Sequence, residues 1–344
     1  MKAAVYEGVR DIKLKDRPDL KAGPGEVIVK IKYCGICGTD VHAYLHEGMT
    51  PTGIVMGHEN CGTISQVGKG VEGWKVGDRV VAGPPGPCGK CYYCIHGQPT
   101  ICVNGLAQTN GLRRDGGMAE YMLVKDPSSM LFKIPDSVSF EDAALFDIVA
   151  VSLRGIRQSR FRIGDNVVVA GAGAIGLSAI QLLRIGGARH ITAVQPSPKK
   201  REMAIKFGAD LAFNPMEEGE NLEKKVKALY GGIGADVAFE AAGTPDAFQS
   251  CINLVRGGGQ VLVLGVATIP TPIVEIQLVV NEIDMRATLA YSADDVNIFL
   301  DLVAQNRFNT EGIVSDIIKL DDIVEKGFER LANTKGLVKI LVAP

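Results

Sequence analysis

A glycine-rich turn that follows a β-branched run constrains this chain more than any other feature. Residues 167–176 read Val-Val-Val-Ala-Gly-Ala-Gly-Ala-Ile-Gly, so a run typical of a buried parallel strand leads directly into Gly-x-Gly-x-x-Gly. Residues 174–184 predict a helix, and strand, glycine turn and helix together predict a dinucleotide-binding unit. The pyrophosphate would lie at the helix N-terminus, where free N–H groups and the helix dipole favour an anion. The candidate cofactor residues are Gly171, Gly173, Ala174, Ile175 and Gly176.

A membrane helix is the alternative for the same stretch, because residues 166–183 carry no charge over about the length of a marginal span. Three glycines and three polar side chains within the stretch argue against that alternative. A second uncharged stretch, residues 257–274, contains two prolines that a membrane helix would not accommodate easily. We therefore expect no membrane association.

The second half of the chain alternates between short apolar runs and longer amphipathic segments. Such alternation predicts an α/β fold with a parallel, doubly wound sheet of the Rossmann type. Strands are expected at 190–194, 211–214, 236–241 and 260–266, and helices at 197–207, 221–230 and 245–255. The tail is expected to add helices at 294–306 and 323–333 and a strand at 337–342.

The first 124 residues have a different texture, rich in glycine and β-branched residues and poor in helical patterns. Segments 27–32, 62–67 and 78–81 predict short antiparallel strands separated by turns. This part is therefore expected to be an all-β, barrel-like region. A length of 344 residues also suggests two domains.

Charge and cysteine content limit the classes of partner. The chain has 37 Lys and Arg against 39 Asp and Glu, and a formal charge of −2 favours neither nucleic acid nor an anionic membrane. The first residues lack the apolar core of a signal peptide. Eight cysteines without an export signal predict a cytoplasmic protein, in which clustered thiols hold metal more often than they form disulfides.

Four closely spaced cysteines form the most specific motif. Cys88, Cys91, Cys94 and Cys102 follow the pattern Cys-x2-Cys-x2-Cys-x7-Cys, and four thiolates can close a tetrahedral zinc site, which is then structural. An iron–sulfur cluster would use the same ligands, but the run is not followed by proline and the sequence has no second cluster motif. A zinc ribbon that binds nucleic acid is another alternative, although basic residues nearby are few. We expect a structural zinc lobe over about residues 86–103.

A second, looser group of metal-binding residues precedes this lobe. Cys37 lies in Gly-Ile-Cys-Gly-Thr-Asp-Val-His at 35–42, and His58 lies in Gly-His-Glu at 57–59. Both side chains suit zinc, and a catalytic zinc needs three protein ligands and an open fourth position. Spacing alone does not select the third ligand. A buried cysteine and a hydrogen-bonded histidine without metal remain the alternative.

These motifs occur together and in a fixed order. The sequence resembles the zinc-containing medium-chain dehydrogenase/reductases over its whole length, most of all their threonine, sorbitol and butanediol dehydrogenase branch. The resemblance implies a GroES-like catalytic domain at about residues 1–150 and 291–344, split around an inserted Rossmann cofactor domain at 151–290. It also implies a homodimer or homotetramer.

The resemblance further implies a catalytic zinc held by Cys37, His58 and a third ligand from the segment before the cofactor domain, where Asp147 stands. Glu59 is an alternate ligand or a close neighbour of the ligands. Two bound carboxylates would weaken the Lewis acidity of zinc, so only one is expected to stay bound in the reactive state. A proton relay would pass from the alcohol through Thr39 and the cofactor ribose to His42.

One departure from the family concerns the choice of cofactor. Where the second Rossmann strand ends, the family often has an acidic residue for the ribose hydroxyls, whereas this chain has Gln195. A neutral amide does not repel a 2′-phosphate, Ser197 can donate to phosphate, and Lys199, Lys200 and Arg201 add positive charge. Lys200 could equally serve a plain ribose. We expect NAD(P) to bind, with a slight preference for NADP.

The expected function is that of a zinc-dependent alcohol dehydrogenase with two zinc ions per chain. Zinc would lower the pKa of a substrate hydroxyl, and hydride would pass reversibly between a secondary alcohol, diol or polyol and the nicotinamide. One alternative is a threonine 3-dehydrogenase-type oxidation of an amino alcohol. The alternative from another class is a non-catalytic zinc-ribbon or structural protein.

Overall fold

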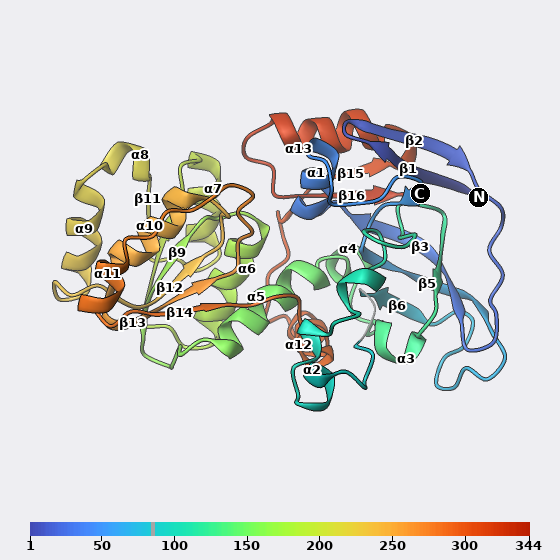
Figure 1. Ribbon diagram of the computed structural model, residues 1–344, viewed down its shortest axis with the longest axis horizontal. Helices are drawn as coiled ribbons and strands as arrows, with labels where there is room; N and C mark the ends of the chain where they lie inside the picture. The colour runs from blue at the N-terminus through green and yellow to red at the C-terminus, as the bar shows by residue number, and fades with distance from the viewer. Residues whose placement is uncertain (84–86) are drawn as a thin grey trace. The chain divides into compact units, whose positions relative to one another are not determined.

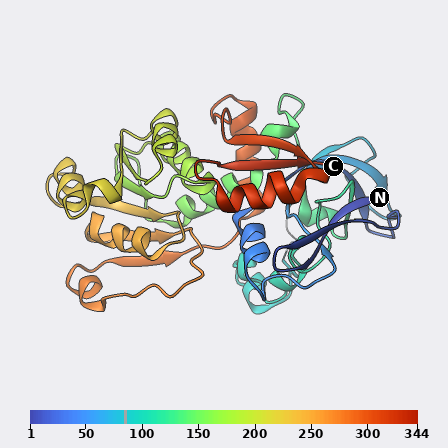
Figure 2. The ribbon, with the colours of Figure 1, turned by 90° about the horizontal axis from the view of Figure 1, so that it is seen from above.

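The chain forms two compact units, shown from two directions in Figures 1 and 2. The structure is a computed structural model that describes residues 1–83 and 87–344, so Gly86, at the edge of the expected zinc lobe, lies outside the described residues. Helix α5, Phe146–Gln158, leads the chain from the first unit into the second. The first unit comprises Met1–Asp147, Ser292–Asn306 and Thr310–Pro344, and the second comprises Ile148–Tyr291 and Arg307–Asn309.

A seven-stranded sheet dominates the first unit. Its order is β15-β16-β3-β5-β6-β8, with β7 also paired to β3, and a separate sheet has the order β2-β1-β4. The pair β15–β16 is parallel, and the other pairs of the unit are antiparallel. The strands are β1 Lys2–Gly8, β2 Asp11–Asp16, β3 Val27–Gly35, β4 Ile54–Val55, β5 Glu59–Val67, β6 Arg79–Ala82, β7 Tyr121–Val124, β8 Leu131–Lys133, β15 Val314–Lys319 and β16 Lys339–Ala343.

Short helices connect these strands. Helix α1, Gly38–Leu45, follows β3, and α12, Ala293–Ala304, begins the C-terminal return of the chain to this unit. The segment expected as one helix at 323–333 is a π-helix, η4 Ile323–Glu329, followed by α13 Arg330–Asn333. The remaining helices are α2 Tyr92–Ile95, η1 Pro99–Ile101, η2 Leu106–Gln108, α3 Pro127–Met130, α4 Phe140–Ala143 and η3 Leu320–Asp322.

Strand β3 organises the end of the sheet where the residues expected to bind metal gather. Val27, Val29 and Ile31 point into the core while Lys30 and Lys32 are exposed, which is the period-two pattern of a strand. The strand pairs with β5 on one side and β16 on the other, and Gly35 lies opposite Glu59. The residues just after Gly35 and just before Glu59 therefore lie at the same end of the sheet.

A parallel six-stranded sheet forms the second unit, as expected. Its order is β11-β10-β9-β12-β13-β14, which in chain order is 3-2-1-4-5-6, the arrangement of a dinucleotide-binding Rossmann fold. The strand order reverses between β9 and β12, and ligands of such sheets bind beyond the carboxyl ends of the strands at this point. The strands are β9 Asn166–Ala170, β10 His190–Val194, β11 Leu211–Phe213, β12 Ala235–Glu240, β13 Val255–Val263 and β14 Asp284–Ala287.

Helices on this sheet follow the expected alternation, and three short elements were not expected. The helices are α6 Ala174–Ile185, α7 Pro198–Lys206, α8 Pro215–Glu218, α9 Asn221–Leu229, α10 Pro245–Leu254 and α11 Glu275–Val280. Helices α8 and α11 and edge strand β14 escaped prediction, because they are short and β14 carries two charges, as edge strands do. Strand β13 begins at Val255 rather than Gln260, because Gly257–Gly259 form a bulge in the ladder instead of a turn.

The uncharged stretches do not form a membrane-spanning segment in the described residues. Residues 166–183 divide into β9, the glycine turn and α6, and residues 257–274 divide into β13 and the loop before α11. Among the described helices, none combines the length and apolar character needed to cross a bilayer.

Candidate metal centres and cofactor site

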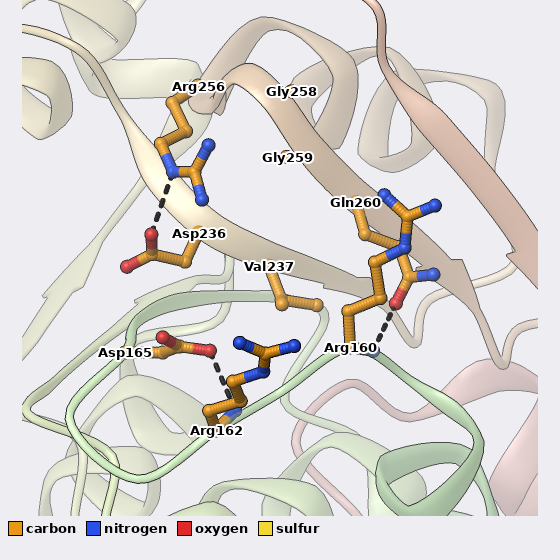
Figure 3. Close-up of a pocket in the computed structure, with 9 residues that line it drawn as sticks. All are labelled: Arg160, Arg162, Asp165, Asp236, Val237, Arg256, Gly258, Gly259 and Gln260. Carbon is orange, nitrogen blue, oxygen red and sulfur yellow. Dashed lines mark hydrogen bonds and ion pairs between the residues drawn. The ribbon is translucent and has the colours of Figure 1, made fainter.

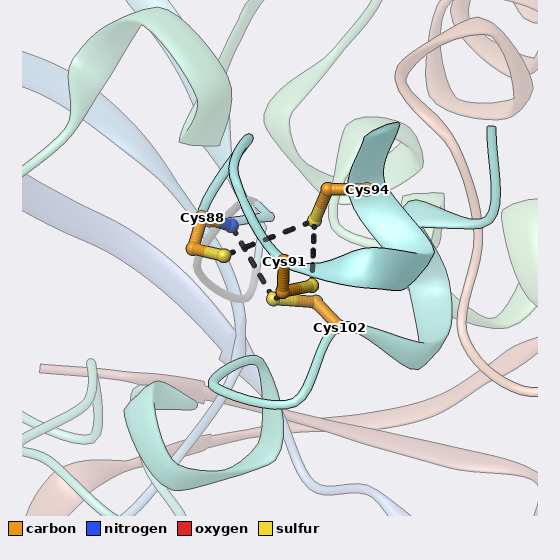
Figure 4. A group of neighbouring side chains, drawn as sticks. All are labelled: Cys88, Cys91, Cys94 and Cys102. Carbon is orange, nitrogen blue, oxygen red and sulfur yellow. Dashed lines mark hydrogen bonds between the residues drawn. The ribbon is translucent and has the colours of Figure 1, made fainter. Parts of the chain in front are cut away.

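The four clustered cysteines meet at one point of the first unit (Figure 4). Cys91 Sγ lies 3.4 Å from Cys94 Sγ and 3.8 Å from Cys102 Sγ, and Cys88 Sγ lies 4.0 Å from Cys94 Sγ. A tetrahedral zinc site with Zn–S bonds of ~2.3 Å places its sulfurs about 3.8 Å apart. The thiols form no disulfides, so the donor set and its spacing fit one tetrahedral metal ion.

Backbone groups in the loop favour the thiolate form that a metal needs. Backbone hydrogen bonds from Cys94 and Val103 lower the pKa of the Cys91 thiol to about 6. Cys91 caps the short helix α2, and the turn glycines Gly89 and Gly97 both have positive φ. Those two turns bring Cys94 and Cys102 back toward Cys88.

A second group of donors gathers in the same unit. One donor atom each of Cys37, His58, Glu59 and Asp147 lies within 4.8 Å of the other three. His58, Glu59 and Asp147 are buried, and Cys37 is half-buried. Cys37 follows β3, His58 precedes β5, and Asp147 stands in the first turn of α5. Residues far apart in the sequence thus form one compact donor set of sulfur, nitrogen and oxygen.

The histidine of this group faces a buried carboxylate. His58 Nδ1 lies 3.4 Å from Asp40 Oδ1, yet neither buried atom makes a hydrogen bond in the described part of the structure. The other Asp40 oxygen accepts a hydrogen bond from the Cys37 backbone N–H at 2.9 Å. A carboxylate beside a ligating histidine orients the ring, so Asp40 fits a supporting position rather than a ligand position.

A buried lysine that the sequence did not single out contacts the fourth member of this group. Lys339 Nζ lies 2.8 and 2.6 Å from the two Glu59 carboxylate oxygens and donates to the Ile36 carbonyl oxygen at 3.2 Å. Burial acts to lower the pKa of Lys339, but the negative charges of Glu59 and Cys37 outweigh it and the pKa ends above its usual value. Lys339 is therefore a cation beside the donor group.

The two residues expected in a proton relay lie on α1. Thr39 Oγ1 is 3.7 Å from Cys37 Sγ, so its hydroxyl stands beside the donor group. His42 is half-buried, and its Nδ1 has no hydrogen-bond partner within the described residues. Burial lowers the pKa of His42, and the neighbouring His46 lowers it further. His42 is thus neutral near pH 7 and able to accept a proton.

The glycine turn of the second unit leaves room for a ligand at the start of α6. Gly171 has φ of 97°, and a side chain there would meet Ala242 N at 2.7 Å. A side-chain carbon on Gly176 would lie 1.8 Å from the Gly171 carbonyl oxygen. The helix therefore packs against the turn too closely for any residue but glycine at this position. At Gly173, the N-cap of α6, such a carbon would enter open space. The helix N–H groups of Ala174 and Ile175 are next to that space, which fits a pyrophosphate.

Comparison with known proteins identifies the family of the chain. The family model for the alcohol dehydrogenase GroES-like domain matches residues 23–136, and the zinc-binding dehydrogenase model matches residues 174–305. The chain is 34% identical over 358 residues to the (R,R)-butanediol dehydrogenase of Bacillus subtilis, covering all of both chains. It belongs to the zinc-dependent medium-chain alcohol dehydrogenases.

Two further similar proteins extend this finding. The D-xylulose reductase A of Aspergillus niger is 30% identical over 348 residues, with 98% of this chain and 95% of that protein covered. A zinc-binding dehydrogenase of Sinorhizobium meliloti 1021, solved with NADP bound, superimposes with a TM-score of 0.90 at 30% identity and covers 100% of this chain and 99% of that one. The predicted GroES-like and Rossmann folds are confirmed, as is the prediction of an NAD(P)-dependent zinc alcohol dehydrogenase that acts on CH–OH groups.

The end of β10 carries the residues expected to select the cofactor of this alcohol dehydrogenase. Gln195 Oε1 accepts a hydrogen bond from the Ser197 backbone N–H at 3.1 Å, which leaves its NH2 group as the outward donor. Arg201 Nη1 donates to the carbonyl oxygens of Gln195 and Pro196 at 2.9 and 2.6 Å. The positive charge of Arg201 therefore supports the loop, and burial lowers the pKa of Lys200.

Two cavities lie at the amino ends of the strands of the Rossmann sheet, opposite the end where a dinucleotide binds. A cavity of about 250 Å³ has Arg160, Arg162 and Arg256 around it (Figure 3), and one of about 300 Å³ has Asn166 and His190. Both are at the amino ends of β9 and its neighbours, whereas a dinucleotide binds beyond the carboxyl ends. In the first cavity Arg256 Nε is 2.7 Å from Asp236 Oδ1 and Arg160 Nε is 3.1 Å from Asp284 Oδ2, so two of its cations are already paired.

We predict that Cys91→Ser costs stability rather than chemistry. Opening a closed metal site removes binding energy that is also folding energy. Metal analysis of the folded variant should fall from about two zinc ions per chain to about one, with a lower Tm and a kcat close to that of the unaltered protein. Cys251→Ser, at a buried thiol of the second unit, should keep both metals. A wild-type chain with four intact cysteines that binds no metal there under metal-replete conditions contradicts this assignment.

Proposed function

We propose that this enzyme oxidises one secondary hydroxyl of a diol or polyol, and reduces the corresponding ketone, with the first unit as the catalytic domain and the second as the cofactor domain. The observation that supports the proposal most is the buried donor group of Cys37, His58 and Asp147 in a unit that also carries a closed four-cysteine group. A purely structural protein has no need of a second, open-sided zinc site. The (R,R)-butanediol and D-xylulose enzymes among its relatives support a diol or polyol substrate.

The ligands of the catalytic metal in this proposal are Cys37, His58 and Asp147, and a second zinc occupies the four-cysteine lobe. Zinc bound by the three would act as a Lewis acid that makes the substrate hydroxyl more acidic. Asp40, whose Oδ1 lies 3.4 Å from His58 Nδ1, would accept a hydrogen bond from the ring and hold its orientation once the other nitrogen binds the metal. Burial of His58 and Asp147 excludes water from their side of the site.

Thr39 and His42 would move the proton that the alcohol releases. Thr39 stands next to Cys37, so its hydroxyl can accept from the substrate and pass the proton on. His42, neutral near pH 7, would receive it one turn further along α1. In the second unit Gly171, Gly173 and Gly176 would shape the turn, and the N–H groups of Ala174 and Ile175 would bind the pyrophosphate.

A substrate screen tests the proposal directly. We expect vicinal diols and polyols to give the highest kcat/KM when nicotinamide absorbance is followed with NAD and with NADP. The screen also contains L-threonine and related amino alcohols, because a threonine 3-dehydrogenase-type activity is the alternative. Highest activity on an amino alcohol, or no activity on any alcohol, contradicts the proposal.

Asp147→Ala should remove the catalytic metal and most activity. Losing a direct ligand should cost more than the ~10–100-fold typical of groups that only support the ligands, so kcat/KM should fall by at least about 100-fold. Zinc content should fall by about one ion per chain while NAD(P) affinity is retained. Asp78→Ala is the matched control, because Asp78 and Asp147 are both 8% exposed in the first unit. Near-normal activity and zinc content in Asp147→Ala make Glu59 the candidate ligand instead.

We propose that NADP is accepted, with a slight preference over NAD. Gln195 offers an NH2 donor and no negative charge at the end of β10, and the NADP-bound Sinorhizobium meliloti protein supports the proposal. One of the three cations expected near a 2′-phosphate is already engaged, because Arg201 donates to two carbonyl groups. Lys199, Lys200 and the Ser197 hydroxyl remain as candidates for a 2′-phosphate.

Gln195→Asp should shift the ratio of kcat/KM values toward NAD by at least about tenfold, or ~1.4 kcal/mol, because a carboxylate accepts from ribose hydroxyls and repels a 2′-phosphate. Asn221→Asp adds the same charge at an exposed position of the second unit and should leave the ratio unchanged. A wild type that ignores NADP, or a ratio that Gln195→Asp does not move, shows that Gln195 does not select the cofactor.

We also propose that the enzyme is a homo-oligomer of the cytoplasm. All eight cysteines are free thiols, which suits a reducing compartment. In the second unit Ile276, Val279 and Val280 are 62%, 69% and 66% exposed, and they precede β14, which ends the sheet. The outer edge of β14 has no partner strand among the described residues, so a second copy would bury both the apolar side chains and the edge.

Val280→Glu should weaken self-association at least about tenfold in sedimentation experiments, because it places a charge in an apolar contact. Ile163→Glu is the matched control, since Ile163 is 85% exposed on the same unit and lies in a different segment. A wild type that sediments as a monomer at micromolar concentration rejects the oligomer.

A further inference from the structure

Three arginines that the proposed function does not use line one cavity of the second unit. Arg160 and Arg162 belong to the segment between α5 and β9, and Arg256 lies in β13 (Figure 3). The cavity has a volume of about 250 Å³. Two aspartates, Asp165 and Asp236, accompany the arginines, so the lining carries one more positive than negative charge. A concave site of this charge favours an anion.

The two aspartates of the lining are occupied by groups of the fold itself. One oxygen of Asp236 accepts from Arg256 Nε at 2.7 Å, and the other accepts from the Asn166 backbone N–H at 2.8 Å. Asp165 Oδ2 accepts a hydrogen bond from the Arg162 backbone N–H at 2.7 Å. The aspartates therefore fix the chain at the start of β9, and they neutralise only part of the arginine charge.

The guanidinium groups keep terminal nitrogens for a ligand. Arg160 Nε lies 3.1 Å from Asp284 Oδ2, and Arg256 also pairs through its Nε, so both side chains are held in place. Arg256 Nη1 donates to the Gly257 carbonyl oxygen at 2.9 Å, whereas Arg256 Nη2 and both terminal nitrogens of Arg160 make no hydrogen bond among the described residues. The Arg162 guanidinium makes neither a hydrogen bond nor an ion pair within the described part of the chain.

Guanidinium groups on several sides of one small cavity suit a phosphate better than a carboxylate. The planar fork of an arginine binds two oxygens of a phosphate at once. A phosphate monoester offers three oxygens in different directions and carries nearly two negative charges at pH 7, whereas a carboxylate offers two oxygens in one plane and one charge. The volume of about 250 Å³ is below that of most pockets for drug-sized molecules, so the ligand is small.

The cavity is separated from the cofactor site by the length of the strands. A dinucleotide binds beyond the carboxyl ends of the sheet, whereas this cavity lies at the amino ends. Strand β9 has five residues and, at ~3.3 Å per residue, places its two ends about 16 Å apart. A small ligand in the cavity therefore does not compete with the cofactor.

We propose that this cavity is a binding site for a small phosphate ester, held by the guanidinium groups of Arg160, Arg162 and Arg256. The inference goes beyond the proposed function and depends neither on the metal ligands nor on the substrate. A ligand that binds the folded unit and not the unfolded chain stabilises the fold by mass action, so occupancy of the cavity also raises the Tm.

The test uses the full-length protein saturated with whichever reduced cofactor, NADH or NADPH, binds more tightly, so that the phosphate positions of the cofactor site are filled. Inorganic phosphate and 2-phosphoglycolate are titrated calorimetrically at constant ionic strength, with acetate as the anion that lacks phosphorus. Because 2-phosphoglycolate has no free hydroxyl group, it is not a substrate for alcohol oxidation.

The variants are Arg162→Ala and Arg256→Ala, with Arg307→Ala as the matched control. Arg162 and Arg307 are both exposed arginines of the second unit without an ion pair among the described residues, and Arg307 does not line the cavity. A change that only removes positive charge from the surface would therefore appear equally in Arg162→Ala and in Arg307→Ala.

We expect the wild type to bind one 2-phosphoglycolate per chain while the cofactor is bound. Arg162→Ala should weaken this binding at least about tenfold, because a hydrogen bond between charged groups typically contributes that factor or more. Arg256→Ala should weaken it by a similar factor, and Arg307→Ala should bind like the wild type. Without ligand, Arg162→Ala should keep the wild-type Tm, because its guanidinium group has no partner to lose.

Three results would overturn the proposal. The wild type could fail to bind either phosphate at millimolar concentration, Arg162→Ala could bind 2-phosphoglycolate as tightly as the wild type, or acetate could bind as tightly as 2-phosphoglycolate. If Arg256→Ala fails to fold, Arg162→Ala still decides the outcome. None of these results bears on the proposed dehydrogenase function, which the separate substrate screen tests.

Discussion

Concentrated negative charge inside the first unit is the constraint on which this structure depends. Asp40, Glu59 and Asp147 are buried together with the half-buried thiol of Cys37, and a fold can accept such a group only if cations offset it. Lys339 supplies one positive charge, and a divalent metal would offset two more of the negative charges. The C-terminal strand β16 therefore has an electrostatic role besides its place in the sheet, because its first residue, Lys339, pairs with Glu59 of the donor group.

The first unit contains two groups of candidate metal donors that differ in composition. The four-cysteine lobe offers only sulfur donors, at spacings that match a closed tetrahedron. The other donor group mixes sulfur, nitrogen and oxygen, and its donors come from positions 37, 58, 59 and 147. A local loop is enough to enclose a metal for stability, whereas an open site needs separate elements whose geometry the surrounding sheet fixes.

Local patterns in the sequence predicted much of the architecture. The Val-rich run with its glycine turn predicted β9 and α6, and the alternation after it predicted a parallel sheet whose observed order is 3-2-1-4-5-6. The cysteine spacing predicted a cluster that the structure brings together, because all four residues lie within one loop region. Short or charged elements escaped: α11 has six residues, and β14 has four with two charges.

Contacts between distant residues could not be predicted in the same way. Cys37, His58 and Asp147 were grouped through a family resemblance, since their spacing alone did not select the third ligand. Lys339 gave no signal at all, because it lies 280 residues from Glu59 and a lysine in a C-terminal strand is ordinarily exposed. The role of Gly35 is equally invisible in sequence, because it depends on which strands flank β3.

Anomalous diffraction from crystals of the zinc-loaded protein, recorded on both sides of the zinc absorption edge, would locate the bound zinc ions. We expect two peaks per chain, one surrounded by Cys88, Cys91, Cys94 and Cys102, and one bound by Cys37, His58 and Asp147. A single peak in the four-cysteine lobe, or a second zinc ion bound by Glu59 in place of Asp147, would contradict this expectation.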